Sequence, residues 1–298
     1  MLPRVYIDPD AGFCMGVRRA IQMAEDHLKS EAVLYCLGQP VHNEAEVERL
    51  ARLGLQVISK DDLDKVGGDM LMIRAHGEPP NTYKLLKDNS IRYLDASCPI
   101  VIKLQDRIRS QQYFLQQEGG QIAVYGKKGH PEVLGLSGQV DNQLLILEGP
   151  EDIVQIDVNR PLQLFCQTTQ DAEAYAHISE LIWQRYNQVA EEQRPVLVIH
   201  PTTCRQIAGR KGRLESFASS MDVILFVSGR ESSNGRYLFD VCKSVNPRAY
   251  FIGGPEDILQ QYWEGAETIG ISGAASTPSW LLEGVYQALT GKMYSGIS

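Results

Sequence analysis

The sequence predicts an α/β protein built from three similar α/β domains around a pseudo-threefold axis. Short apolar runs typical of buried strands alternate with helical patterns along all 298 residues. One order of features also occurs three times, with a period of about 100 residues. Each third contains a strand, a loop with one cysteine, a helix and two further strands that end in polar motifs. The expected domains are residues 1–97, 98–194 and 195–298.

Composition excludes several classes of protein. The chain has 29 Lys and Arg against 37 Asp and Glu, a net charge of −8, and no basic stripe that would neutralise nucleic-acid phosphates. No apolar run approaches the length of a membrane span, and the N-terminus lacks the apolar stretch of a signal peptide. We therefore expect a cytoplasmic protein without nucleic-acid or membrane partners. Its six cysteines should be thiols or metal ligands rather than disulfides.

A single cysteine follows the first strand of each third and precedes a helix. These cysteines are Cys14, Cys98 and Cys204. Apolar residues at helical spacing follow each of them. They are Val17, Ile21, Ala24 and Leu28 after Cys14; Val101, Leu104 and Ile108 after Cys98; and Ile207, Leu214 and Phe217 after Cys204. The third pattern is the most polar.

Two polar motifs complete each third. The first lies four residues after a glycine that ends a strand, at His42, His130 and Ser233. The second follows the next strand and contains the residues His76, Thr168 and Thr169, and Ser276 and Thr277. Because ligand-binding residues of α/β sheets lie in loops beyond the carboxyl ends of the strands, we expect these motifs to face a common site.

Three cysteines at helix starts suit a metal centre. The helix N-terminus favours the thiolate form, and three thiolates can hold zinc with a bound water or an iron–sulfur cluster with one open iron. The spacing does not distinguish these two centres. We interpret the other cysteines as buried core residues: Cys36, Cys166 and Cys242.

The polar motifs suit a phosphate ligand and a proton donor. Imidazole, hydroxyl and amide groups at loops and helix starts bind phosphate oxygens well. Glu132 is the one carboxylate within these motifs, and a carboxyl beside an anion has a raised pKa and can carry a proton. The proposed phosphate ligands are His42, His76, His130, Ser232, Ser233, Asn234 and Ser276.

Taken together, these motifs resemble those of the IspH/LytB reductases, the 4-hydroxy-3-methylbut-2-enyl diphosphate reductase family. The resemblance extends in order from about residue 5 to residue 285. The matching segments are Gly12–Ile21, Val41–Asn43, Ala75–Gly77, Cys98–Lys103, Gly129–Gly135, Gln167–Thr169, Ser232–Asn234 and Ala275–Pro278.

The resemblance implies three α/β domains around a central [4Fe-4S] cluster held by Cys14, Cys98 and Cys204, with one iron open for substrate. It also implies a diphosphate pocket formed by the ligands named above together with Thr168. Glu132 matches the proton-delivery residue, Thr168 matches a hydroxyl that orients substrate, and His130 completes the catalytic group.

The implied reaction is a two-electron reductive dehydroxylation of an allylic diphosphate to isopentenyl and dimethylallyl diphosphates. It is the last step of the non-mevalonate isoprenoid pathway. Ferredoxin or flavodoxin would donate the electrons, and three self-contained domains permit a monomer.

Several alternatives remain open in the sequence. Aligning Thr202-Thr203 with the commoner family pattern would put Ile199 at the third ligand position, whereas aligning cysteine on cysteine selects Cys204 and keeps the spacing to Ser232. A zinc-dependent phosphoester hydrolase could use the same three cysteines. A cluster-containing sensor would need no diphosphate pocket. A nucleotide-binding protein is disfavoured because no Gly-x-Gly-x-x-Gly follows a strand.

Overall fold

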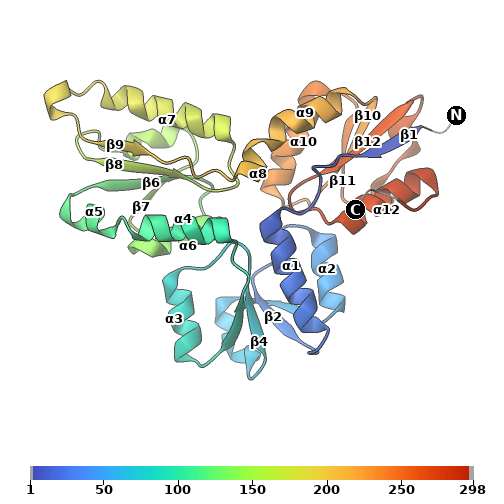
Figure 1. Cartoon of the computed structure of the whole chain (residues 1–298), viewed down its shortest axis with the longest axis horizontal. Coiled ribbons are helices and arrows are strands. Elements are labelled where there is room, and N and C mark those ends of the chain that lie inside the picture. The colour runs from blue at the N-terminus through green and yellow to red at the C-terminus, as the bar shows by residue number, and fades with distance from the viewer. Residues whose placement is uncertain (1–2, 295–298) are drawn as a thin grey trace. The chain divides into compact units, whose positions relative to one another are not determined.

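The computed structural model describes residues 3–294 and divides into two compact units. Unit 1 comprises Met1–Asp62 and Gly209–Ser298, and unit 2 comprises Leu63–Ala208. The strands are grouped in three sheets, with four strands to a sheet, and the recorded pairings are parallel (Figure 1). The α/β class and the threefold occurrence of its sheet are therefore confirmed.

Unit 1 contains the first three strands of the chain and the last three. Its strands are β1 (Arg4–Ile7), β2 (Leu34–Leu37), β3 (Leu55–Ile58), β10 (Val223–Val227), β11 (Ala249–Ile252) and β12 (Thr268–Gly273). Its helices are α1 (Met15–Leu28), α2 (Glu44–Arg52), α9 (Arg210–Ser219), α10 (Ser233–Val245), α11 (Gln260–Trp263) and α12 (Ser279–Thr290).

Unit 2 contains the six strands between them. Its strands are β4 (Met70–Ile73), β5 (Arg92–Asp95), β6 (Gln121–Tyr125), β7 (Leu144–Leu147), β8 (Leu162–Cys166) and β9 (Leu197–Ile199). Its helices are α3 (Pro80–Asp88), α4 (Pro99–Arg109), α5 (Gln112–Gln117), α6 (Pro131–Ser137), α7 (Ala172–Tyr186) and α8 (Arg205–Ala208).

Each unit contains one complete sheet, and the two sheets have the same strand order. Unit 1 has β1-β12-β10-β11 and unit 2 has β9-β8-β6-β7. The strand that precedes each of the three cysteines pairs with a strand that ends in a polar motif, as β1 does with β12, β5 with β4 and β9 with β8. The expected division at residues 97 and 194 stays a prediction. β1 and β9 each pair with a strand that this division assigns to a different domain.

Both faces of the complete sheets are covered by helices. In unit 1, α12 packs against one face through Leu281 and Val285, and α9 and α10 pack against the other through Leu214 and Leu238 (Figure 1). The central strand β10 is buried along its whole length. Burial on both faces explains why such a strand appears in the sequence as a continuous apolar run. The helix expected after Cys204 is two helices, α8 and α9, separated at Gly209.

Candidate metal and phosphate site

Cys14, Cys98 and Cys204 occupy the same local structure in the three repeats. Each lies directly before a helix, and its carbonyl accepts a hydrogen bond from the N–H four residues later, at 2.9, 2.9 and 2.8 Å respectively. Each is half-buried, whereas Cys36, Cys166 and Cys242 are buried as predicted. All six are thiols rather than half-cystines. The first three are therefore the cysteines with access to a ligand.

The backbone N–H of each of these cysteines also makes an equivalent hydrogen bond to a loop that follows a strand. It donates to the carbonyl of the second residue after β12, β4 or β8. The bonds run from Cys14 to Ala275 at 3.1 Å, from Cys98 to Ala75 at 2.9 Å and from Cys204 to Thr168 at 2.8 Å. This repeated bond places each cysteine next to one of the polar motifs. Ile199, the alternative ligand position, lies inside β9 and pairs with Leu164, so the repeat supports Cys204.

In unit 2, His76 and His130 lie side by side. Their rings meet edge to face, with centroids 5.3 Å apart and planes at 81°. His130 is the N-cap of α6, and its Nδ1 accepts a hydrogen bond from the backbone N–H of Glu132 at 3.2 Å. This bond fixes the orientation of the ring.

Glu132 forms a buried pair with Thr168. The backbone N–H of Thr168 donates to Oε1 at 2.7 Å, and its hydroxyl donates to Oε2 at 2.9 Å. Burial raises the pKa of Glu132 to about 7, and the two hydrogen bonds from Thr168 oppose that rise. Because this pKa lies near neutral pH, the buried carboxyl is present there in both its protonated and its ionised form. The pair is therefore suited to hold and release a proton.

In unit 1, two of the predicted phosphate ligands are joined by a hydrogen bond, and a third bonds to the loop that contains one of them. The Oγ atoms of Ser232 and Ser276 are 3.1 Å apart, and Asn234 Oδ1 accepts from the N–H of Ala275 at 3.3 Å. Ser232 is also the N-cap of α10, and Ser233 is that helix's first residue. The N–H groups and the dipole at a helix start favour an anion.

His42 lies beside the same loop of unit 1. A Cβ on Gly229 would be 2.6 Å from the carbonyl oxygen of His42, which shows how closely the two backbones approach. The neighbouring Asn43 caps α2 by accepting from the N–H of Glu46 at 3.1 Å. The glycine that ends β10 thus allows the loop before Ser232 to contact the His42 segment.

A buried ion pair that the sequence did not reveal supports this part of unit 1. Arg210 donates to Asp8 Oδ2 at 2.7 Å and to Ser272 Oγ at 2.9 Å, and Ser272 donates to the same Asp8 oxygen at 2.7 Å. Asp8 precedes the Cys14 loop, and Ser272 precedes the Ser276 loop. Because 202 residues separate Arg210 from Asp8, no local sequence pattern indicates the pair.

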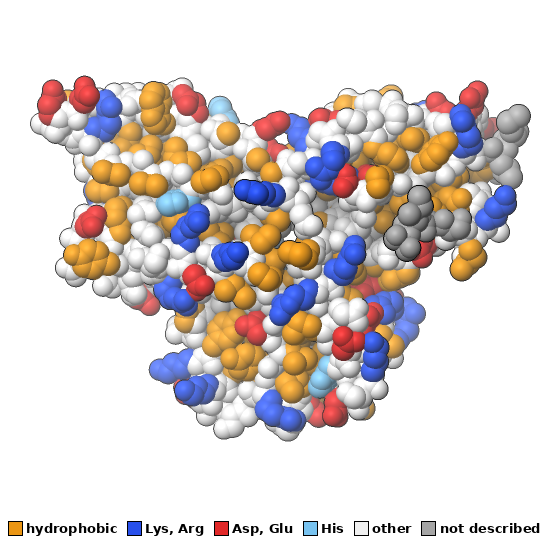
Figure 2. Space-filling model, viewed as in Figure 1, with side chains coloured by type: hydrophobic (Ala, Val, Ile, Leu, Met, Phe, Trp, Pro, Cys, Tyr) orange, Lys and Arg blue, Asp and Glu red, His pale blue; other side chains and the backbone are white. Residues whose placement is uncertain are grey.

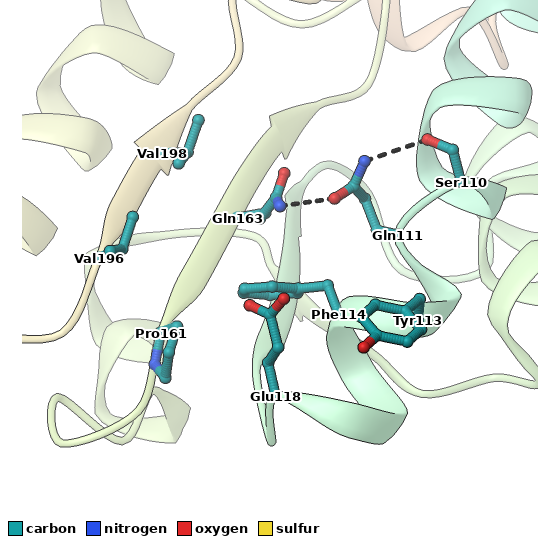
Figure 3. Close-up of a pocket in the computed structure, with 9 residues that line it drawn as sticks. All are labelled: Ser110, Gln111, Tyr113, Phe114, Glu118, Pro161, Gln163, Val196 and Val198. Carbon is teal, nitrogen blue, oxygen red and sulfur yellow. Dashed lines mark hydrogen bonds between the residues drawn. The ribbon is translucent and has the colours of Figure 1, made fainter.

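Two surface hollows of unit 2 lie outside the predicted ligand set. Figure 3 shows one, of about 350 Å³, where Gln111 hydrogen-bonds to Gln163 and to Ser110. The other, of about 620 Å³, is mostly apolar and includes Pro201 and Thr203 of the Cys204 loop. Hydrophobic side chains gather over the region of β8 and β9 in Figure 2. Neither hollow is lined by a predicted catalytic, phosphate-binding or cysteine residue.

Among the described residues, no helix combines the length and the apolar character that a membrane crossing requires.

Comparison with known proteins agrees with the motifs. The family model described as LytB protein matches residues 5–290. A relative from Bacteroides fragilis is 39% identical over 292 residues, covering 97% of this chain and 98% of its own. One from Parabacteroides distasonis is 42% identical over 281 residues, covering 94% and 95%. Both are named 4-hydroxy-3-methylbut-2-enyl diphosphate reductase, and neither name supports the zinc hydrolase alternative.

Two solved structures share the fold. The E-1-hydroxy-2-methyl-but-2-enyl-4-diphosphate reductase from Plasmodium falciparum is 25% identical, with a TM-score of 0.80 over 95% of this chain and 86% of its own. A second structure, of (E)-4-hydroxy-3-methyl-but-2-enyl diphosphate reductase, is 29% identical, with a TM-score of 0.72 over 98% and 100%. Its title calls it the terminal enzyme of the non-mevalonate pathway. From the family match and the near-complete coverage of these relatives, we conclude that the chain belongs to the LytB protein family.

Proposed function

We propose that this protein reduces 4-hydroxy-3-methylbut-2-enyl diphosphate to isopentenyl and dimethylallyl diphosphates, the final reaction of the non-mevalonate isoprenoid pathway. The observation that carries the proposal is the identity of 39% to 42% with reductases of that name along nearly the whole chain. In this reaction the allylic C–O bond breaks and a C–H bond forms. Two electrons and two protons are consumed, and water leaves.

Cys14, Cys98 and Cys204 would hold an iron–sulfur cluster. The donor set fits this group, because three half-buried thiols at helix starts provide three soft ligands and leave one position for substrate. When bound, a [4Fe-4S] cluster would supply the electrons and a Lewis-acidic iron.

The diphosphate would be bound by the residues that match the family's phosphate pocket. His76 and His130 form a fixed pair in unit 2, and the helix start at Ser232 and Ser233 provides hydroxyl and N–H donors in unit 1. His42, Asn234 and Ser276 complete the proposed pocket. Such a remote anionic group supplies binding energy that orients the reacting end of the substrate.

Glu132 would deliver a proton to the departing oxygen. Its pKa of about 7 lies close to neutral pH, where a proton carrier is most effective. Thr168 holds both carboxyl oxygens, and His130 is linked to the backbone N–H of Glu132. Thr168 would also orient the substrate.

The electrons would come from a ferredoxin or a flavodoxin, and the protein would act in the cytoplasm as a monomer. The electron donor rests on the family resemblance, the cytoplasmic location on the composition of the chain, and the monomer on the expectation of three self-contained domains.

The first test is the iron and acid-labile sulfide content of anaerobically purified protein, together with its visible spectrum. We expect about four of each per chain and a brown chromophore absorbing broadly near 400 nm. Turnover of 4-hydroxy-3-methylbut-2-enyl diphosphate with a chemical reductant should follow the cluster content. A colourless protein with stoichiometric zinc, or a brown protein without this turnover, would contradict the proposal.

A further inference from the structure

The hydrogen-bond ladder between β8 and β9 continues beyond the end of β9 toward Cys204. The strands pair in parallel, with Leu164 opposite Ile199. Past this point, His200 N–H donates to Leu164 O at 2.9 Å and Cys204 N–H donates to Thr168 O at 2.8 Å. A regular ladder would place backbone bonds between these two, at Cys166.

The side chain of Thr202 takes the place of those backbone bonds. Its hydroxyl donates to the carbonyl of Cys166 at 2.8 Å and accepts from the N–H of the same residue at 2.8 Å. One hydroxyl thus satisfies both backbone groups of a strand-end residue, as a hydroxyl can because it is donor and acceptor at once. The backbone of Thr202 is therefore connected to β8 through the Thr202 side chain and not through backbone hydrogen bonds.

Because Thr202 bonds to β8 through its side chain, the N–H of Thr168 is not used in the ladder between the strands. In a regular parallel ladder that N–H would donate to the neighbouring strand. Here it donates to Glu132 Oε1 at 2.7 Å, while the carbonyl of Thr168 accepts from Cys204. The two backbone groups of one residue therefore hold the proposed proton carrier and the loop of a proposed cluster ligand.

The Cys98 loop does not contain this device. There, Ala96 N–H donates to Ile73 O and Cys98 N–H donates to Ala75 O, both at 2.9 Å. The two bonds are two residues apart on each strand, whereas those of His200 and Cys204 are four apart. Because the shorter step continues the ladder without a gap, no side chain is needed to bridge it.

We propose that Thr202 is a positioning residue that couples the Cys204 loop to the Glu132–Thr168 pair. This inference rests on the proposed function. Without its hydroxyl, the N–H and carbonyl of Cys166 would lose their partner, and the backbone bonds on either side would compete to replace it. Both Cys204 and Glu132 would then lose their fixed positions together.

The test compares Thr202→Val, which keeps the shape and removes the hydroxyl, with Thr202→Ser, which keeps the hydroxyl. Thr203→Val is the matched control, because Thr203 is a half-buried neighbour whose side chain lines a surface hollow. The first measurement is the rate at which anaerobic, cluster-loaded protein releases iron to a chelator. The second is the separation of kcat from KM for the diphosphate substrate.

We expect Thr202→Val to release iron roughly 10-fold to 100-fold faster, the usual effect of removing a group that supports a metal ligand. Its kcat should fall at least about 10-fold while KM changes less than about twofold, because the hydroxyl of Thr202 bonds to Cys166 and to none of the proposed histidine or serine phosphate ligands. Thr202→Ser should restore both values, and Thr203→Val should match the wild type.

The inference is overturned if Thr202→Val releases iron and turns over like the wild type. It is also overturned if Thr203→Val behaves like Thr202→Val, because the hydroxyl of Thr202 would then have no special role. If Thr202→Val does not fold, Thr202→Ala against Thr202→Ser gives the same comparison. A wild-type protein that held no iron would instead remove the proposed function, and the coupling with it.

Discussion

Thr168 binds both oxygens of the Glu132 carboxyl, through its backbone N–H at 2.7 Å and its hydroxyl at 2.9 Å. The two residues are 36 positions apart in the sequence and both are buried. The pair gives the site a carboxyl with a fixed orientation and a pKa near neutrality.

Replacing Glu132 by Gln tests its role as the proton carrier. Glutamine keeps the size of the side chain and one hydrogen-bond acceptor but cannot donate a titrating proton. We expect kcat to fall about 10²-fold to 10⁴-fold, the usual contribution of a general acid. Iron content and substrate affinity should stay close to the wild type, as measured by iron assay and equilibrium binding. Turnover within about twofold of the wild type would exclude Glu132 as the proton carrier.

The raised pKa of Glu132 predicts that stability falls as pH rises. The folded carboxyl keeps its proton up to about pH 7, whereas the unfolded carboxyl loses it near its ordinary value of 4.5. Between these values the folded state binds more protons, so the free energy of unfolding decreases as pH increases. The total loss is on the order of 3 kcal/mol.

Urea unfolding of the apo-protein at pH 5 and pH 7.5 measures this effect. Glu132→Gln carries no titrating group at this position, so its stability relative to the wild type should increase over that interval. The same titration predicts that kcat of the wild type decreases as pH rises through about 7. A relative stability that did not change with pH would contradict the assigned pKa.

Removing Arg210 should destabilise unit 1 strongly. Arg210→Ala would leave the buried carboxylate of Asp8 without its cation, which typically costs about 3–5 kcal/mol. Arg213→Ala is a control on the same helix, because Arg213 pairs with Asp10 at the exposed surface. That variant should cost less than about 1 kcal/mol. Equal losses of unfolding free energy for the two variants, measured by urea unfolding, would show that the buried Arg210–Asp8 pair stabilises unit 1 no more than the exposed pair does.

The cysteines should separate into two groups. Cys204→Ala removes a half-buried thiol in the repeated position, and we expect the purified protein to lose its cluster or hold it incompletely. Cys36→Ala removes a buried core thiol and should retain the wild-type iron content with a modest loss of stability. Iron and sulfide assays under anaerobic conditions measure the cluster content of both variants. Full cluster content in Cys204→Ala would show that Cys204 is not the third cluster ligand.

Gly229→Ala tests the contact between the His42 segment and the loop before Ser232. The added methyl carbon would lie 2.6 Å from the carbonyl oxygen of His42, so one of the two loops must shift. We expect KM for the diphosphate to rise, because residues of both loops belong to the proposed phosphate pocket. Gly212→Ala is the control, since nothing lies within 4 Å of its added carbon. Unchanged KM in Gly229→Ala would remove this contact from substrate binding.

Much of the fold could be predicted from local sequence. Continuous apolar runs such as Val223–Val227 identified buried strands, because strands covered on both faces need apolar side chains throughout. The starts of α1 and α4 could be predicted at Cys14 and Cys98 from the helical spacing that follows them. The recurrence of one cysteine and two polar motifs per third also indicated which loops carry the site.

Only the tertiary structure decided which strands are neighbours and which distant groups meet. The pairing of β1 with β12 joins the two ends of the described chain, and hydrogen bonds between strands leave no signal in either strand alone. The Arg210–Asp8 pair depends on that pairing, and the contact of Thr202 with Cys166 depends in the same way on the pairing of β9 with β8. The pKa of Glu132 depends on burial, which is set by the packing of unit 2 and not by the residues beside Glu132 in sequence. The sequence by itself thus determined the chemical groups of the site, whereas their partners and protonation follow from contacts between segments far apart in the chain.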